Sequence, residues 1–113
     1  MKVKRSRLYE GMYILNATLS EDARKKALAK ITDGITGKGG EIHKIHDMGK
    51  KRLAYAIKKK KEGYYYLLYF NLESKLVPEL WQEYHLNEDL IRYMTLTADS
   101  VKETLEFKPL KQI

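Results

Sequence analysis

The sequence predicts an α+β, ferredoxin-like fold with the element order βαββαβ: a four-stranded antiparallel sheet with two helices on one face. Two segments have apolar residues at helical spacing, and four segments between or beside them have strand-like patterns. The length of 113 residues suits one such domain. We therefore expect a domain with a basic N-terminal arm at residues 1–98. Residues 99–113, where apolar side chains become sparse, are expected to form a loosely ordered tail.

The first half of the chain contains a strand and a helix. Residues 9–15 (YEGMYIL) are apolar or aromatic at nearly every position, which is typical of a strand covered on both sides. The helix can begin at Thr18, which has capping-box spacing to Glu21, or at Ser20, which is an equally suitable cap. Its apolar positions recur every three or four residues and are Ala23, Ala27, Leu28, Ile31 and Ile35. Glycines from Gly37 onward predict its end.

The second half predicts a hairpin, a helix and a last strand. Residues 41–57 alternate as a strand, with an interruption at 48–49, and residues 58–63 (KKKKEG) are expected to form the hairpin tip. Residues 63–70 give the strongest strand signal in the chain. A helix should start at Ser74 or Lys75, with Pro78 in its first turn. Its expected buried stripe is Leu76, Val77, Leu80, Trp81 and Tyr84. Residues 90–96 (LIRYMTL) complete the sheet.

Positive charge is concentrated in two blocks, although the formal net charge is only +7. Residues 44–61 contain eight lysines and arginines against one aspartate, and the first seven residues contain four more basic residues. Concentrated positive charge favours polyanions, because each neutralised phosphate releases condensed counterions. Solvated lysine-rich faces are the plain alternative, but the asymmetry along the chain favours a nucleic acid partner.

The predicted sheet has apolar residues on both of its faces. In residues 64–70 both alternating sets are aromatic or aliphatic, and residues 11–15 repeat this pattern. Because helices cover only one face of this fold, the other face should be an interaction surface. The alternative is that the tail or a second copy of the chain covers it.

Groups that would indicate other functions are missing from the sequence. We find no nucleophile with its base, no phosphate-binding glycine loop and no paired-carboxylate site, so we expect no catalytic residues, cofactor or small-molecule substrate. His43 and His46 are three residues apart, which on a strand sends them to opposite faces, so we expect no metal site. There is no cysteine and no apolar run of membrane-spanning length, so we expect a cytoplasmic protein with no membrane partner.

One segment resembles the signature of the bacterial small-subunit ribosomal protein six family. It is residues 49–58 (GKKRLAYAIK), and the family pattern is glycine, basic residues, Leu-Ala-Tyr-x-Ile and a polar or basic residue. Three further segments match in order and spacing: residues 7–10 (RLYE), 63–65 (GYY) and 86–94 (LNEDLIRYM). The resemblance extends from residue 7 to about residue 97. Alanine at position 56, where proline is frequent in the family, is a modest departure.

The resemblance implies a structural role in the platform of the small ribosomal subunit. Members of this family pair with ribosomal protein eighteen and bind the central domain of 16S rRNA as a heterodimer. By matching positions, Arg7 and Arg92 are the first expected RNA contacts. The other expected RNA contacts are Lys50, Lys51, Arg52, Lys58, Lys59, Lys60, Lys61, Lys4 and Arg5. The expected partner-protein surface is Met12, Tyr65, Leu67, Tyr69 and Met94.

Three rival interpretations share the predicted topology. A stand-alone RNA-recognition motif would stack bases of single-stranded RNA on aromatic residues of its central strands, but Tyr65 occupies the position where its signature has glycine or alanine. A dimeric regulatory module would use the apolar face for self-association and would need no basic blocks. A small enzyme would need catalytic groups that the sequence does not contain.

Overall fold

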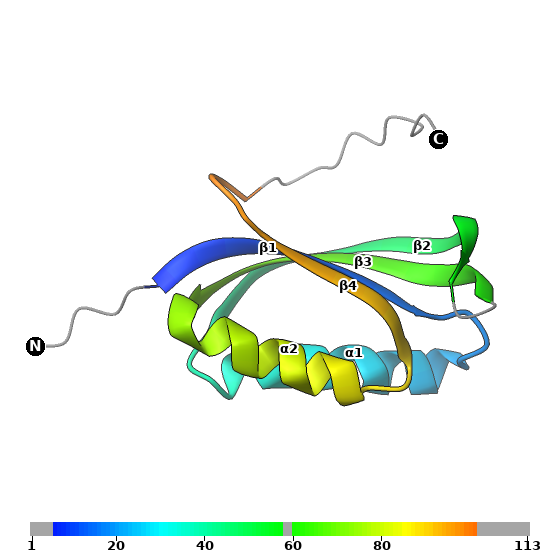
Figure 1. Cartoon of the computed structure of the whole chain (residues 1–113), viewed down its shortest axis with the longest axis horizontal. Helices are drawn as coiled ribbons and strands as arrows, with labels where there is room; N and C mark the ends of the chain where they lie inside the picture. The colour runs from blue at the N-terminus through cyan, green and yellow to red at the C-terminus, as the bar shows by residue number, and fades with distance from the viewer. Residues whose placement is uncertain (1–5, 58–59, 102–113) are drawn as a thin grey trace, which may run out of the picture.

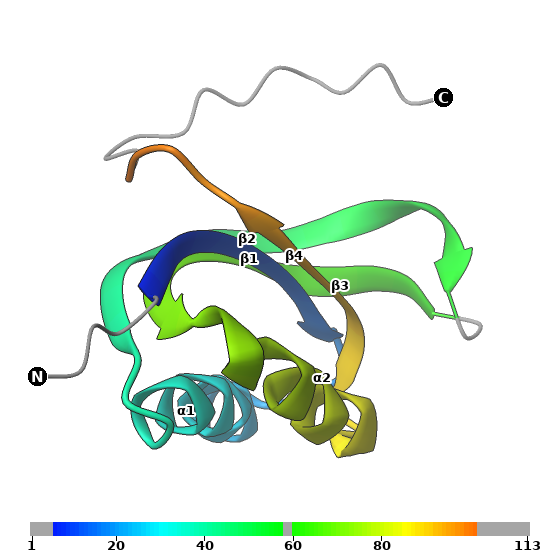
Figure 2. The same ribbon diagram turned by 60° about the vertical axis from the view of Figure 1, so that its left-hand side comes forward.

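The computed structural model describes residues 6–57 and 60–101 and confirms the predicted fold class. Four antiparallel strands form one sheet, and both helices lie on the same side of it (Figure 1 and Figure 2). The strands are β1 (Ser6–Asn16), β2 (Glu41–Ile57), β3 (Lys60–Glu73) and β4 (Leu90–Thr97). The helices are α1 (Glu21–Thr36), α2 (Val77–Leu86) and a single 3₁₀ turn, η1 (Ser74–Leu76).

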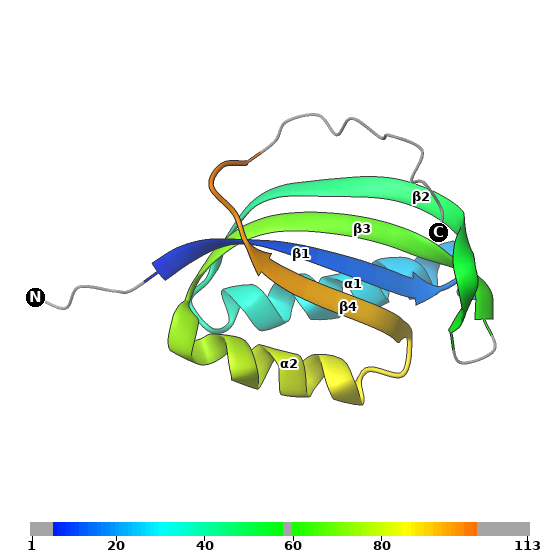
Figure 3. The same ribbon diagram turned by 45° about the horizontal axis from the view of Figure 1, so that its top comes forward.

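The strand order is β2-β3-β1-β4, so β1 and β3 are central and β2 and β4 form the two edges (Figure 3). β1 pairs with β3 without interruption, from Ser6 opposite Glu73 to Asn16 opposite Gly63. β3 therefore extends past the end of β1 by the three residues from Lys60 to Glu62. This overhang belongs to the β2–β3 hairpin and is the only part of β3 without β1 beside it.

Helix α1 begins at Ser20, one of the two predicted caps. The Ser20 hydroxyl accepts a hydrogen bond from the Ala23 amide at 3.1 Å, whereas Thr18 bonds the Asn16 side chain. The helix ends at Gly37, as predicted, and the positive φ of +83° falls at Gly39. A left-handed residue two positions beyond the helix turns the chain toward β2.

Helix α2 is preceded by η1 and carries Pro78 in its first turn, as predicted. The prediction that Trp81 is buried is wrong: its side chain is 42% exposed, and its indole nitrogen donates to the Thr95 hydroxyl at 3.2 Å. Leu80 occupies the buried face, and the next residue is rotated by about 100° around the helix. Trp81 therefore lies over the β4 edge and not within the core.

The hairpin differs from its prediction at two points. β2 runs without a break through residues 48–49, where a register shift replaces the expected interruption. β3 already begins at Lys60, so residues 60–63 are strand and the predicted tip at 58–63 is too long. Residues 58–59 lie outside the described part of the chain. Turn-forming composition was outweighed by the ladder between the two strands, in which Arg52 pairs with Glu62.

The core lies between the helices and one face of the sheet. Its buried residues come from β1, β3 and β4 and from both helices. They include Tyr13, Leu15, Tyr66, Leu68 and Phe70 from the central strands and Ala27, Ile31, Ile35, Leu80 and Tyr84 from the helices. Because successive strand residues point to opposite faces, this packing determines which residues lie on the other side, here called the helix-free face.

Two tyrosines form a polar contact within this core. The hydroxyls of Tyr13 and Tyr84 are 2.6 Å apart, and the two rings meet edge to face with centroids 5.2 Å apart. Burial is the main cause that raises the pKa of each hydroxyl above its ordinary value. Both groups therefore stay neutral, and each satisfies the other where water is excluded.

Leu80→Ala should lower the free energy of unfolding by about 2–5 kcal/mol, because Leu80 is fully buried between α2 and the sheet. Leu86→Ala on the same helix is the matched control, since Leu86 is 79% exposed and its loss should cost less than about 0.5 kcal/mol. Urea unfolding of both variants measures the difference. Equal costs would show that α2 packs through another face.

Tyr84→Phe should lower the free energy of unfolding by about 1–3 kcal/mol, because it leaves the Tyr13 hydroxyl buried without its partner. Adding Tyr13→Phe removes that stranded group, so the double variant should lose less than the sum of the two single losses. A double-mutant cycle by urea unfolding measures this coupling. Strict additivity would contradict a direct bond between the hydroxyls.

Candidate RNA and protein interface

The strand register arranges the helix-free face in rows across the sheet. In the first row Leu67 of β3, Met12 of β1 and Met94 of β4 are directly opposite one another. The next row is Tyr69, Glu10 and Leu96, and the third is Tyr65, Ile14 and Arg92. All five residues predicted for a protein partner therefore share one face.

These five residues differ in how much surface they offer. Leu67 and Tyr69 are buried, with Tyr69 only 1% exposed and its hydroxyl donating to the Glu10 carboxylate at 2.7 Å. Met94 is 45% exposed, and Met12 and Tyr65 are half-buried. Leu96, which the sequence analysis did not single out, is 53% exposed and lies two residues from Met94 on the same strand. Strand alternation from Met94 would have identified it.

The two histidines of β2 lie on the same face, which contradicts the prediction of opposite faces. His43 hydrogen-bonds the Asn71 side chain, and the His46 ring meets the Tyr69 ring edge to face at 6.0 Å. Asn71 and Tyr69 are two residues apart on β3 and so share one face. A register shift between Ile42 and Lys44 adds one residue to β2, which reverses the alternation that the sequence suggested.

Basic residues follow the β2 edge of the sheet. Lys44 pairs with Tyr69, and the segment Lys50–Arg52 pairs with residues 62–64 of β3. Lys50 and Arg52 are exposed and Lys51 is half-buried. The ladder places Lys44 and Lys51 on the helix-free face, whereas Lys50 and Arg52 alternate to the helix side. The segment Lys50–Arg52 can therefore present charge on both sides of an edge strand.

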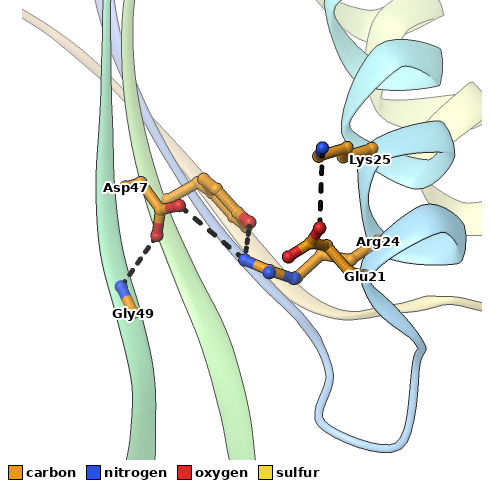
Figure 4. Close-up of polar contacts among 6 residues, drawn as sticks. Glu21, Arg24, Lys25, Asp47 and Gly49 are labelled. Atoms are coloured by element: carbon orange, nitrogen blue, oxygen red, sulfur yellow. Dashed lines mark hydrogen bonds and ion pairs between the residues drawn. The ribbon is translucent and has the colours of Figure 1, made fainter.

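A cation from helix α1 contacts β2 immediately before this segment (Figure 4). Arg24 donates to the Tyr66 hydroxyl at 2.8 Å, lies 4.3 Å from the centre of the Tyr64 ring and is 3.7 Å from the Asp47 carboxylate. The hydrogen bond to Tyr66 is the main cause that raises the pKa of Arg24, and burial is the main cause that raises that of Tyr66. The Asp47 side chain is 56% exposed, so this ion pair contributes only about 0–1 kcal/mol to stability.

Arg92 lies beside a small apolar cluster on the helix-free face. The cluster contains Ile14, Leu53 and Ile91, with Tyr65 packed against it. Burial raises the pKa of Tyr65, and the charge of Arg92, which lies in the same cross-strand row, opposes that rise. A side chain at Gly63 would come within 2.4 Å of the Ile14 methyl group, so glycine there lets the cluster close.

The structure places Arg92 and the segment Lys50–Arg52 at one end of the sheet and Arg7 near the other end. Gly49, Tyr65, Ile14 and Arg92 are successive cross-strand partners, so Arg92 lies at the same end of the sheet as the segment Lys50–Arg52. Three strand spacings separate them, about 14 Å. Arg7 pairs with Leu72 near the other end of β1, about 23 Å away along the strand, and alternates to the helix side. Lys61 is exposed on the β3 overhang.

The remaining predicted RNA contacts lie outside what the structure describes. Lys4, Arg5, Lys58 and Lys59 fall outside the described residues, and for Lys60 only the backbone is described. Within residues 6–57 and 60–101 no three histidine or acidic side chains converge as a metal site would require. In the same part of the chain no helix has the length and apolar character to cross a bilayer.

Comparison with known proteins identifies the family. The sequence matches the family model described as "Ribosomal protein S6" over residues 8–97. Relatives from Chlamydia caviae and Chlamydia pneumoniae, both named "Small ribosomal subunit protein bS6", are each 60% identical over 112 residues, which is 99% of this chain and 100% of the relative.

A solved structure agrees with this assignment. The crystal structure of 30S ribosomal protein S6 from Thermotoga maritima superposes with a TM-score of 0.78 at 31% identity, covering 82% of this chain and 88% of that one. These homologues are structural ribosomal proteins, which confirms the prediction that this protein is not an enzyme. The chain belongs to the ribosomal protein S6 family, as the resemblance of its signature segment predicted.

Proposed function

We propose that this chain is a structural constituent of the small ribosomal subunit that binds the central domain of 16S rRNA together with ribosomal protein eighteen as a heterodimer. Membership of the S6 family supports the ribosomal role. The observation that carries the two-partner proposal is the separation of charge and apolar surface across the sheet. The β2 edge carries Lys44 and the segment Lys50–Arg52, whereas the β4 edge carries the exposed Met94 and Leu96 and, at the end of the sheet nearest that segment, one exposed cation, Arg92.

The cationic edge suits a phosphate backbone. Lysine and arginine side chains that neutralise phosphates release counterions, and each such contact steepens the salt dependence of binding by about 0.7–0.9 in a plot of log affinity against log salt. We assign this role to the segment Lys50–Arg52 and to Arg92, which lies at the same end of the sheet. We also assign it to Lys61 on the overhang and, at a separate point of contact, to Arg7.

The apolar β4 edge suits a polypeptide. Met94 and Leu96 expose about half of their side-chain surface beside the half-buried Met12, and Glu10 lies in the same row as Leu96. Burial of such side chains by a partner stabilises a complex by roughly 25 cal/mol per Å2 of apolar surface removed from water. A partner seated on Met94 and Leu96 leaves the β2 edge open for RNA, and Arg92, nearer the other end of β4, lies between the two proposed surfaces.

The alternative of a stand-alone RNA-recognition motif is less well supported. That motif stacks bases on exposed aromatic rings of the central strands. On the helix-free face Tyr69 is 1% exposed and its hydroxyl is held by Glu10, so its ring offers no platform for a base. A heterodimer predicts weak RNA binding by this chain alone and strong binding with the partner protein. Tight binding of short single-stranded RNA by the chain alone would favour the recognition motif.

Arg92→Ala should weaken assembly with 16S rRNA and ribosomal protein eighteen by about 1–3 kcal/mol while the domain stays folded, if the guanidinium contacts a phosphate or base. Filter binding over a range of salt concentrations measures both affinity and salt slope. Lys26→Ala is the control, since it removes one exposed positive charge from α1, on the other side of the molecule. Equal affinities for both variants would remove Arg92 from the interface.

Met94→Glu should weaken binding of ribosomal protein eighteen at least about tenfold, because it places a charge in the middle of the apolar surface that the partner would cover. The melting temperature should change little, since Met94 is already 45% exposed. Met94→Leu keeps the surface apolar and should bind normally. Titration calorimetry with the purified partner measures the affinities, and wild-type affinity of Met94→Glu would place the partner elsewhere.

A further inference from the structure

We infer that Arg24 is a positioning residue for RNA binding, acting through Asp47 to set the direction in which the segment Lys50–Arg52 leaves the sheet. The inference rests on the proposed RNA contact of that segment. Arg24 belongs to α1 and is remote in sequence from the signature segment at residues 49–58, yet it would control where the charges of β2 lie.

A tight turn precedes the segment Lys50–Arg52. The Asp47 carboxylate accepts a hydrogen bond from the Gly49 amide at 2.9 Å, and Gly49 has a φ of +80°. A register shift between Asp47 and Gly49 interrupts the ladder with β3 at the same place. The three observations describe one bulge, which changes strand direction and twist. Its geometry sets the path of the next three residues.

Arg24 anchors that turn through Asp47. The other carboxylate oxygen of Asp47 lies 3.7 Å from the Arg24 guanidinium. The guanidinium is itself fixed by the Tyr66 hydroxyl at 2.8 Å and by the Tyr64 ring at 4.3 Å. Arg24 is only 18% exposed, so one rigid cation joins α1, β2 and β3. Figure 4 shows one carboxylate oxygen of Asp47 facing this cation and the other facing Gly49.

The segment Lys50–Arg52 begins beside this anchor. Lys50 pairs with Tyr64, the residue whose ring lies beneath Arg24. β2 is an edge strand, so hydrogen bonds to β3 are its only ladder. A bulge bends its strand and increases the local twist, so side chains bonded at the bulge bear on the direction of the residues that follow. Asp47 and Arg24 are the side chains that hold it here.

Arginine suits this role better than lysine. The planar guanidinium stacks on an aromatic ring while its nitrogen atoms bond in the same plane, whereas an ammonium is a single point of charge. Lys25, the next residue of α1, makes only an i,i+4 pair with Glu21 at 3.7 Å and is 72% exposed. The two cations are adjacent on one helix and have the same charge, so they form a matched pair for an experiment.

The experiment uses directed hydroxyl-radical cleavage within the assembled complex with 16S rRNA and ribosomal protein eighteen. The chain has no cysteine, so Glu62→Cys provides a single site for a tethered iron chelate. Glu62 pairs with Arg52 in the ladder, is exposed and is not one of the proposed RNA contacts. The probe therefore reports the direction of the segment without removing a contact.

Arg24→Met in the probe background should shift the set of cleaved nucleotides and weaken assembly by up to about fivefold, whereas Lys25→Met should change neither. Asp47→Asn keeps an oxygen for the Gly49 amide but removes the charge, so it should shift the cleavage in the same way as Arg24→Met. It also keeps the test interpretable if Arg24→Met fails to fold. A purely structural defect would weaken all cleavages equally without moving them.

Failure of the positioning role and failure of the proposed RNA contact would give different results. Unchanged cleavage sites in both Arg24→Met and Asp47→Asn would overturn the positioning role while leaving the proposed RNA contact intact. Absence of any rRNA cleavage by the probe in the parent protein would contradict the RNA contact of this segment, on which the inference rests.

Discussion

The packing of two helices against one face of β1 and β3 is the constraint on which the rest of the structure depends. Once Tyr13, Leu68 and Phe70 are buried beneath the helices, strand alternation sends Met12, Leu67 and Tyr69 to the other face. The sequence supplies apolar residues to both sets. A change of register would therefore not make the helix-free face polar, and beside the buried Leu67 and Tyr69 this face offers Met12, Met94 and Leu96 to a further partner.

Local one-residue irregularities mark the limit of prediction from this sequence. Element types and order follow from periodicity, and residue chemistry predicts the helix end at Gly37 and limits the cap to Thr18 or Ser20, of which the structure shows Ser20. The faces of His43 and His46 do not, because alternation counts residues and a bulge adds one that no pattern reveals. The exposure of Trp81 was missed for a related reason: helical spacing defines an apolar stripe roughly 100° wide around the helix, and packing against β4 decides where the border of that stripe lies.

The candidate site was predictable in composition but not in arrangement. The signature segment indicated the basic residues, and strand alternation indicated the apolar ones, yet neither shows that Arg7 and Arg92 lie near opposite ends of β1. The antiparallel pairing of β1 with β4 produces that separation, because it places Arg92 opposite Ile14, seven residues along β1 from Arg7. This pairing joins segments that are distant in the sequence. Arg24 gave no signal at all, because its partners Asp47, Tyr64 and Tyr66 come from two strands more than twenty residues away.

Three consecutive tyrosines of β3 show how one strand serves both faces. Tyr64 and Tyr66 point toward the helices and hold Arg24 by ring and hydroxyl, whereas Tyr65 points to the helix-free face and lies near Arg92. A run of identical residues thus supports two cations on opposite sides of the sheet. Phenylalanine in place of Tyr66 removes the hydroxyl that accepts from Arg24, but phenylalanine in place of Tyr64 keeps a ring for the cation. The three positions are therefore chemically distinct despite their shared identity, and β3 links the orientation of the β2 edge to the surface beside β4.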